Sequence, residues 1–259
     1  MSFSKDVACI IAKYLAKYEL LDWIDINKLS WNELSENPAA IDLLKANQDK
    51  IDWRILSLNP AAMDILIANP DKINWVYLSR NPSAIDILIT NHDKIDWNGL
   101  STNPAAIDLI EDNLDKINWS YLSLNPAAID IICDYSCYIN WNYLSENSAA
   151  IKLLTANPNK IHWYWLSANT SAIELLNANL NKIYWNVLSS NPAAIDILCD
   201  YQNKIDWNCL SANPAAIDLI KSNRGKIDWK VLSRNPAIFE LKLDLKLVDK
   251  LLEVPSINL

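Results

Sequence analysis

The residue types that most often perform catalysis are few and scattered in this chain of 259 residues. The only two histidines are His92 and His162, and each takes a place that ordinary polar residues fill elsewhere. No serine-nucleophile elbow, glycine-rich phosphate loop or zinc-ligand spacing is present. The chain has only two glycines, Gly99 and Gly225, which leaves few places for a backbone to wrap around a phosphate. We therefore expect no enzymatic activity and no cofactor.

The cysteines offer one candidate metal site. Cys133 and Cys137 lie four residues apart with Asp134 between them, a spacing at which a helix would place both thiols on one face. Two thiolates without a histidine make a poor site, so we expect a repacked turn and no metal. The five cysteines are odd in number and irregularly spaced, which favours free thiols in a reducing, intracellular compartment.

A serine recurs every 22 residues, always four residues after a tryptophan. Leucine follows each of these tryptophans by three residues and asparagine by six. The ten repeat tryptophans are Trp31, Trp53, Trp75, Trp97, Trp119, Trp141, Trp163, Trp185, Trp207 and Trp229. Such a fixed period is typical of a stacked repeat protein. Because ten identical catalytic serines would make no sense, we expect each serine to bind a free carbonyl at a helix end.

Two helices can be predicted within each repeat. Asp52 precedes its tryptophan and can cap a short first helix, and Asn59 can cap a second helix that has Pro60 in its first position. The second helix is expected to run to about Ala68, and Asn69 to end it in a left-handed conformation. Isoleucine precedes each repeat tryptophan by two residues, except in the first repeat where it is leucine, and leucine follows by three, so we expect the repeat tryptophans in an apolar core.

The predicted fold class is all-α, an α-solenoid of about ten helix–turn–helix repeats. A leucine-rich repeat is the alternative, since 22 residues falls in its range. However, the tryptophan and leucine are three residues apart rather than two, and the strand signature L-x-L-x-x-N is absent. We predict an N-terminal capping helix over 1–30, the solenoid over 31–241 and an amphipathic C-terminal cap over 242–259.

Composition limits the partners. The net charge of −8 disfavours binding to phosphate backbones, so nucleic acid is not expected. The N-terminus reads as neither a signal peptide nor a membrane span. One repeat position is acidic in nine copies, and we call it the acidic rail: Asp42, Asp64, Asp86, Asp108, Asp130, Glu174, Asp196, Asp218 and Glu240. This rail either forms weak pairs with the repeat lysines or attracts a basic partner.

Functional information should lie where the repeats differ. The second residue after the tryptophan is aromatic in three consecutive repeats, as Tyr121, Tyr143 and Trp165. Stacked helices would set these steps about 9 Å apart. Lys152 reverses the charge of the acidic rail nearby, and the turn at Ser136 to Tyr138 is irregular. An aromatic centre with an altered charge rim predicts a partner-binding surface made by Tyr121, Tyr143, Trp165 and Lys152. The alternative is that the rings only fill gaps between repeats.

The repeat unit, carried for example by Asn69 to Pro82 and Asn157 to Asn169, resembles tandem-repeat proteins of mimivirus-like giant DNA viruses. This resemblance implies an intracellular viral protein in an infected host cell or virion, without implying an activity. The segment from Lys5 to Leu21 resembles the opening of an F-box, which implies docking onto a ubiquitin-ligase adaptor. Three functions follow as hypotheses: a non-enzymatic scaffold for a protein partner of unknown identity, a structural or self-associating virion component, and a ubiquitin-ligase substrate adaptor.

Overall fold

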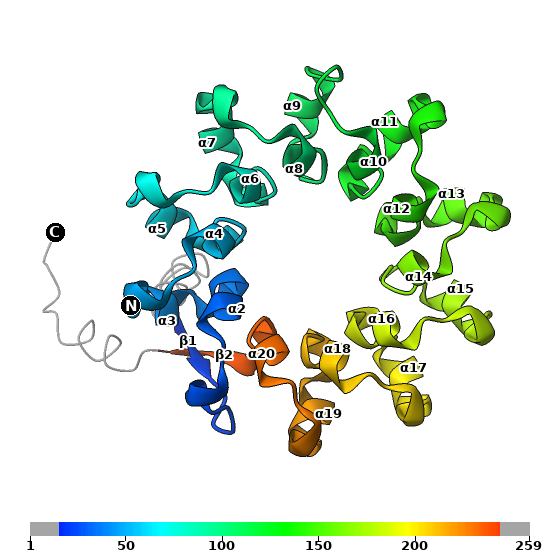
Figure 1. The fold of residues 1–259 in the computed structure, drawn as a ribbon. Helices are drawn as coiled ribbons and strands as arrows, with labels where there is room; N and C mark the ends of the chain where they lie inside the picture. Colours follow the sequence, from blue (N-terminus) through cyan, green and yellow to red (C-terminus); the bar gives the residue numbers. More distant parts are fainter. Residues whose placement is uncertain (1–15, 244–259) are drawn as a thin grey trace, which may run out of the picture.

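The computed structural model describes residues 16–243 and shows a closed ring of helical repeats (Figure 1). Each repeat places its first helix on the inner side of the ring and its second helix on the outer side. The prediction of an all-α repeat solenoid is confirmed, with one small two-stranded sheet where the first and last described segments meet.

The inner helices all begin at a repeat tryptophan. They are α2 Trp31–Glu36, α4 Trp53–Leu56, α6 Trp75–Leu78, α8 Trp97–Ser101, α10 Trp119–Leu122, α12 Trp141–Glu146, α14 Trp163–Leu166, α16 Trp185–Ser190, α18 Trp207–Ser211 and α20 Trp229–Leu232. Helices this short are unstable alone, so their stability must come from contacts between repeats.

The outer helices begin at the isoleucine or methionine after the paired small residues. They are α3 Ile41–Lys45, α5 Met63–Ile67, α7 Ile85–Thr90, α9 Ile107–Glu111, α11 Ile129–Asp134, α13 Ile151–Ala156, α15 Ile173–Asn177, α17 Ile195–Asp200 and α19 Ile217–Ser222. In most repeats a 3-10 turn precedes them: η2 Pro38–Ala40, η4 Pro60–Ala62, η6 Pro82–Ala84, η8 Pro126–Ala128, η10 Ser148–Ala150, η13 Pro192–Ala194 and η15 Pro214–Ala216. In the last repeat the equivalent turn, η17 Pro236–Ile238, leads into a strand. A second set links one repeat to the next: η1 Ile26–Lys28, η3 Gln48–Lys50, η5 Pro70–Lys72, η7 His92–Lys94, η9 Ser136–Tyr138, η11 Pro158–Lys160, η12 Leu180–Lys182, η14 Gln202–Lys204 and η16 Arg224–Lys226.

The predicted N-caps are confirmed. The Asp52 carboxylate accepts the Ile55 N–H at 3.1 Å, and the Asn59 Oδ1 accepts the Ala61 N–H at 3.0 Å. The predicted left-handed C-cap at Asn69 is wrong, since Asn69 has φ −136° and no non-glycine residue of 16–243 has a positive φ. Instead, the Asn69 Nδ2 donates to the Ile65 carbonyl at 2.9 Å, so its side chain ends the helix without the left-handed turn.

The core consists of the repeat leucines and alanines, such as Leu56 and Ala62, which are fully buried. The prediction that the tryptophans are core is wrong: they are half-buried, at the edge of the core. A basic side chain covers the exposed face in most repeats, as where the Lys72 Nζ lies 4.2 Å from the Trp53 ring centre. In one repeat a tyrosine takes the lysine's place, and Tyr138 stacks on Trp119 with ring centres 4.8 Å apart. The irregular turn therefore covers its tryptophan by ring stacking.

A ladder of buried asparagines joins the repeats. The Asn59 Nδ2 donates to the Ser35 carbonyl at 3.0 Å and to the Asn37 carbonyl at 3.1 Å, both in the preceding repeat. The other members do the same: Asn37, Asn81, Asn103, Asn125, Asn147, Asn169, Asn191, Asn213 and Asn235. Asn37 in the first repeat donates to the carbonyls of Ser233 and Asn235 in the last. The ring is thus closed by the same bonds that hold its interior.

The repeat serines form a second ladder. The Ser35 hydroxyl donates to the Trp31 carbonyl at 2.8 Å and accepts the Asp52 N–H of the next repeat at 3.0 Å. The predicted structural role is confirmed, but the carbonyl is not a free one at the helix end, since the Trp53 carbonyl accepts both the N–H and the hydroxyl of Ser57. At the seam between last and first repeats, the Ser30 N–H donates to the Ser233 Oγ at 2.8 Å.

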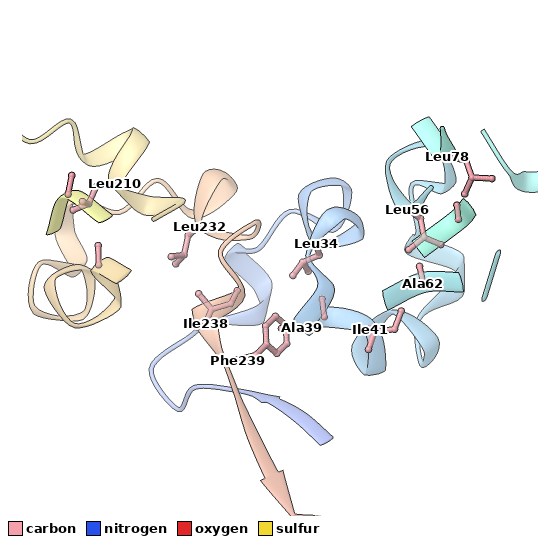
Figure 2. Packing of buried hydrophobic residues seen from close by; sticks show 14 of the residues in the cluster. Leu34, Ala39, Ile41, Leu56, Ala62, Leu78, Leu210, Leu232, Ile238 and Phe239 are labelled. Carbon is pink, nitrogen blue, oxygen red and sulfur yellow. The ribbon is translucent and has the colours of Figure 1, made fainter. Parts of the chain in front are cut away.

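The last repeat is completed by the N-terminal segment. Strand β2 (Phe239–Leu243) replaces the outer helix and pairs antiparallel with β1 (Ala16–Leu20). Turn η1 takes the place of the linking 3-10 turn that would follow the last repeat. Its Lys28 Nζ lies 4.8 Å from the centre of the Trp229 ring, as the lysines of other linking turns lie over the tryptophans of their repeats. Figure 2 shows Leu232 and Ile238 of the last repeat beside Leu34 and Ala39 of the first.

These contacts differ from the prediction of a separate cap at each end of the solenoid. Residues Ala16–Leu20, predicted as helix and as the end of the F-box-like stretch, form a strand. The apolar residues Phe239, Leu241 and Leu243 alternate with polar ones, a period of two that suits a strand better than a helix. The rest of the F-box-like stretch and most of the predicted C-terminal cap lie outside the described residues.

An ion-pair cluster crosses the seam on the inner helices. The Glu33 carboxylate is 5% exposed and is paired with Arg234, just after α20, and, at 3.9 Å, with the Lys230 Nζ of α20. The hydrogen bond to Glu33 raises the pKa of the Arg234 guanidinium. A buried carboxylate needs such partners to offset its desolvation, so the pairing specifies which repeats meet at the seam.

Candidate interaction surface on the inner helices

Positions within a repeat are counted from its tryptophan, so that position +2 is the second residue after it. The +2 residues Tyr121, Tyr143 and Trp165 lie on the neighbouring inner helices α10, α12 and α14. Their rings are in contact: the centres of Tyr121 and Tyr143 are 5.8 Å apart and stacked, and those of Tyr143 and Trp165 are 5.5 Å apart and edge-on. The three rings thus form one continuous row, closer together than the helix spacing predicts.

Two further tyrosines extend this row. Tyr164, at position +1 of α14, lies 5.4 Å from the Trp165 ring and also 5.4 Å from the Tyr184 ring of the next repeat. Tyr164 is 38% exposed and Tyr184 is 49% exposed. We call these five rings the inner aromatic surface: Tyr121, Tyr143, Tyr164, Trp165 and Tyr184.

Tyr164 and Tyr184 were not predicted from the sequence, although a signal was present. Tyr184 stands where most repeats have the Asp or Asn that caps the inner helix, and no side-chain cap bond forms there. His162 also lacks the cap bond, and its ring lies 6.4 Å from that of Tyr164. The loss of two helix caps in consecutive repeats marks a place where another demand on the sequence outweighs local stability.

The exposed side of these helices faces the inside of the ring. Each inner helix has an inner helix on either flank and an outer helix behind it (Figure 1). The side left over carries the exposed +1 residues, such as Asn98, Asn142 and Tyr164. A shallow, open pocket of about 300 Å³ lies beside the row, lined by Trp163, Lys182 and Tyr184 among others.

Lys152, predicted as part of the same surface, lies apart from the rings. It is exposed on outer helix α13, in the acidic rail position, whereas the rings lie on inner helices. The charge reversal therefore borders the rail. Within residues 16–243, no ion pair joins a rail carboxylate to a repeat lysine, and most of these lysines lie over tryptophan rings.

The cysteines, serines and histidines considered as catalytic or metal-binding groups do not come together in one site within the described residues. Cys133 and Cys137 are exposed free thiols, and the part of the chain between residues 16 and 243 holds no cluster of three or more metal-ligating side chains. The repeat serines are buried and bonded, as described above. His92 packs edge-on against Trp97, with ring centres 5.3 Å apart. Cys9 lies outside the described residues.

Comparison of the chain with protein-family models, with curated proteins and with solved structures found no match. Among the described helices, none has the length and apolar character needed to cross a bilayer. The surface itself must therefore indicate the function.

Proposed function

We propose that this ring is a non-enzymatic scaffold that binds a protein partner through the inner aromatic surface. The observation that carries the proposal is the row of five touching, partly exposed rings on four consecutive repeats of an otherwise regular structure. Repeated residues serve packing in every copy equally, so the departures from the repeat are where one partner can be distinguished from another. Aromatic residues dominate interface hot spots because they bring large contact area with few rotatable bonds.

Ring closure weighs against the alternative of a polymerising structural component. Solenoids assemble end to end through the exposed faces of their terminal repeats. Here the first repeat is hydrogen-bonded to the last, so both terminal faces are used within the chain. The resemblance to giant-virus repeat proteins supports an infected host cell as the place where the partner is found.

The test compares which proteins are captured from host cells by the wild-type ring, by an aromatic double variant and by a control double variant. Replacing both Tyr143 and Trp165 by Ala should weaken partner capture by about 2 kcal/mol or more, with helicity unchanged. The matched control carries Ile55→Ala and Val231→Ala, which are at the same +2 position outside the surface. A partner retained by the control and lost from the aromatic variant supports the proposal. Equal capture by both variants would place binding elsewhere, most simply on the acidic rail.

A further inference from the structure

The +2 side chains pack in a fixed way around the ring. At the seam, at Gly99 and at Tyr77 they lie against position +1, position +5 or both of the preceding repeat. At the seam, Glu33 at +2 is paired with Lys230 at +1 and Arg234 at +5. Between the third and fourth repeats, a Cβ on Gly99 would lie 3.0 Å from the Arg80 Cγ at +5. Two separate places in the ring thus show the same neighbours.

The same rule places Glu146 beside the aromatic row. Glu146 is at position +5 of α12, so the same register pairs it with Trp165, the +2 residue of the next repeat. Tyr143 is three residues before Glu146 on the same helix and therefore shares its face. The Glu146 side chain is half-buried, and this burial raises the pKa of its carboxyl. The register of the repeats therefore sets this carboxylate beside the two aromatic rings, and its surroundings are partly desolvated.

No cation among the described residues compensates this carboxylate. Among residues 16–243, no side chain forms an ion pair or hydrogen bond with Glu146. The seam provides the contrast, because there the same two repeat positions hold the complementary pair Glu33 and Arg234. A half-buried carboxylate with no partner is an unfavourable arrangement that a bound cation would relieve.

Aromatic rings in this protein already hold cations. Lysine ammonium groups lie 4.2 to 5.0 Å from tryptophan ring centres in seven repeats, and the Arg54 guanidinium lies 5.8 Å from the Tyr77 ring at a +2 position. Aromatic faces attract cations through their quadrupole, and an adjacent carboxylate adds a charge-assisted hydrogen bond. The net charge of −8 favours the approach of a basic segment.

We propose that Glu146, Tyr143 and Trp165 form a binding site for a lysine or arginine side chain presented by a basic segment of the protein partner. This inference rests on the proposed function and specifies the partner's chemistry. The carboxylate receives the N–H groups of the cation, and the two rings cover its apolar stem and charged head. The remaining rings, Tyr121, Tyr164 and Tyr184, contact the residues on either side in the partner.

The experiment uses the full chain and a short capped peptide with one arginine between alanines, and follows the indole N–H signal of Trp165 by NMR. A matched peptide carries citrulline, which keeps the shape of arginine without its charge. Glu146→Gln should weaken binding of the arginine peptide about tenfold, as expected for loss of a charge-assisted hydrogen bond, and should leave the citrulline peptide unaffected. The control Glu174→Gln, on the acidic rail, removes the same charge elsewhere and should not change either affinity.

Three results would overturn the inference. The first is that the indole N–H signal of Trp165 does not shift with the arginine peptide at millimolar concentration. The second is that the protein binds the arginine and citrulline peptides with equal affinity. The third is that Glu146→Gln and Glu174→Gln lose equal affinity for the arginine peptide. Partner capture separates this failure from failure of the proposed function. If capture is lost with Tyr143→Ala and Trp165→Ala but is unchanged by Glu146→Gln, the surface binds a protein without using a cation. If neither variant affects capture, both proposals fail.

Discussion

The asparagine ladder predicts a large effect from replacing one side-chain nitrogen by oxygen. The Asn125 side chain is fully buried, and its Nδ2 donates to the carbonyls of Ser101 and Asn103 at 3.1 and 3.0 Å. Its Oδ1 accepts the Ala127 N–H at 3.0 Å, so both ends of this amide are used. Asn125→Asp has nearly the same shape and keeps the cap, but its carboxylate has no hydrogen to give to the two carbonyls.

The magnitude follows from the groups left unsatisfied. Each buried carbonyl without a donor costs about 1–3 kcal/mol, so the two together cost about 2–6 kcal/mol. Repulsion between the carboxylate and the carbonyl oxygens adds to this cost and raises the pKa of the introduced acid. The loss should therefore become smaller toward acidic pH, where the protonated acid can donate to one carbonyl.

Urea unfolding followed by tryptophan fluorescence, at neutral and acidic pH, measures the change against the wild type at each pH. The control is Asn186→Asp, the same chemical change at an exposed +1 position, for which we expect a change within about 0.5 kcal/mol. If Asn125→Asp is no more destabilised than this control, the ladder does not hold the repeats together.

Three other variants test separate parts of the structure. Leu122→Ala, in the fully buried leucine row, should lower the free energy of unfolding by about 2–5 kcal/mol. Lys72→Ala uncovers one face of Trp53 and should lower it by only about 0.5–1 kcal/mol. Equal losses of stability in the two variants would contradict the assignment of the core. Arg234→Met leaves the buried Glu33 carboxylate with a weaker partner and should cost about 1–3 kcal/mol in urea unfolding, and a double variant with Glu33→Gln should recover most of that loss. Burial raises the pKa of Glu146, so the folded chain binds this proton more tightly than the unfolded chain, and stability falls as pH rises through the folded-state pKa. Glu146→Gln should therefore raise the urea midpoint at pH about 7 and give no gain at a pH below 4.5, the ordinary pKa of a glutamate; a gain of equal size at both would contradict the burial of this carboxylate.

The repeat unit and its caps could be predicted because they depend on local chemistry. Asp52, Asn59 and Pro60 act within a few residues of their own position, and the sequence places them at each helix start. The asparagine ladder was missed because the capping role used only Oδ1 and left the two Nδ2 hydrogens without partners. The side-chain amide recurs in every repeat, and finding partners for both of its hydrogens would have indicated a bond to the neighbouring repeat.

Ring closure could not be derived from the repeat alone, because it depends on a small rotation between neighbours that accumulates around the structure. One signal was nevertheless present. The segment from Asn27 to Trp31, N-K-L-S-W, matches D-K-I-D-W in the repeats, so the N-terminus carries the link that the last repeat lacks. The half-burial of the tryptophans was missed because flanking apolar residues are equally consistent with a fully buried ring.

Two distances measured by pulsed electron paramagnetic resonance test ring closure most directly. Nitroxide labels at Lys45 and Lys221, with the native cysteines replaced, would report the distance between the first and ninth outer helices. Labels at Ile67 and Glu111 occupy equivalent exposed positions on α5 and α9, two repeats apart along the chain. In a closed ring the first pair is also two repeats apart, across the seam, so the two distance distributions should coincide. A clearly longer distance between the labels at Lys45 and Lys221 would mean that the solenoid is open, and the split last repeat would be refuted.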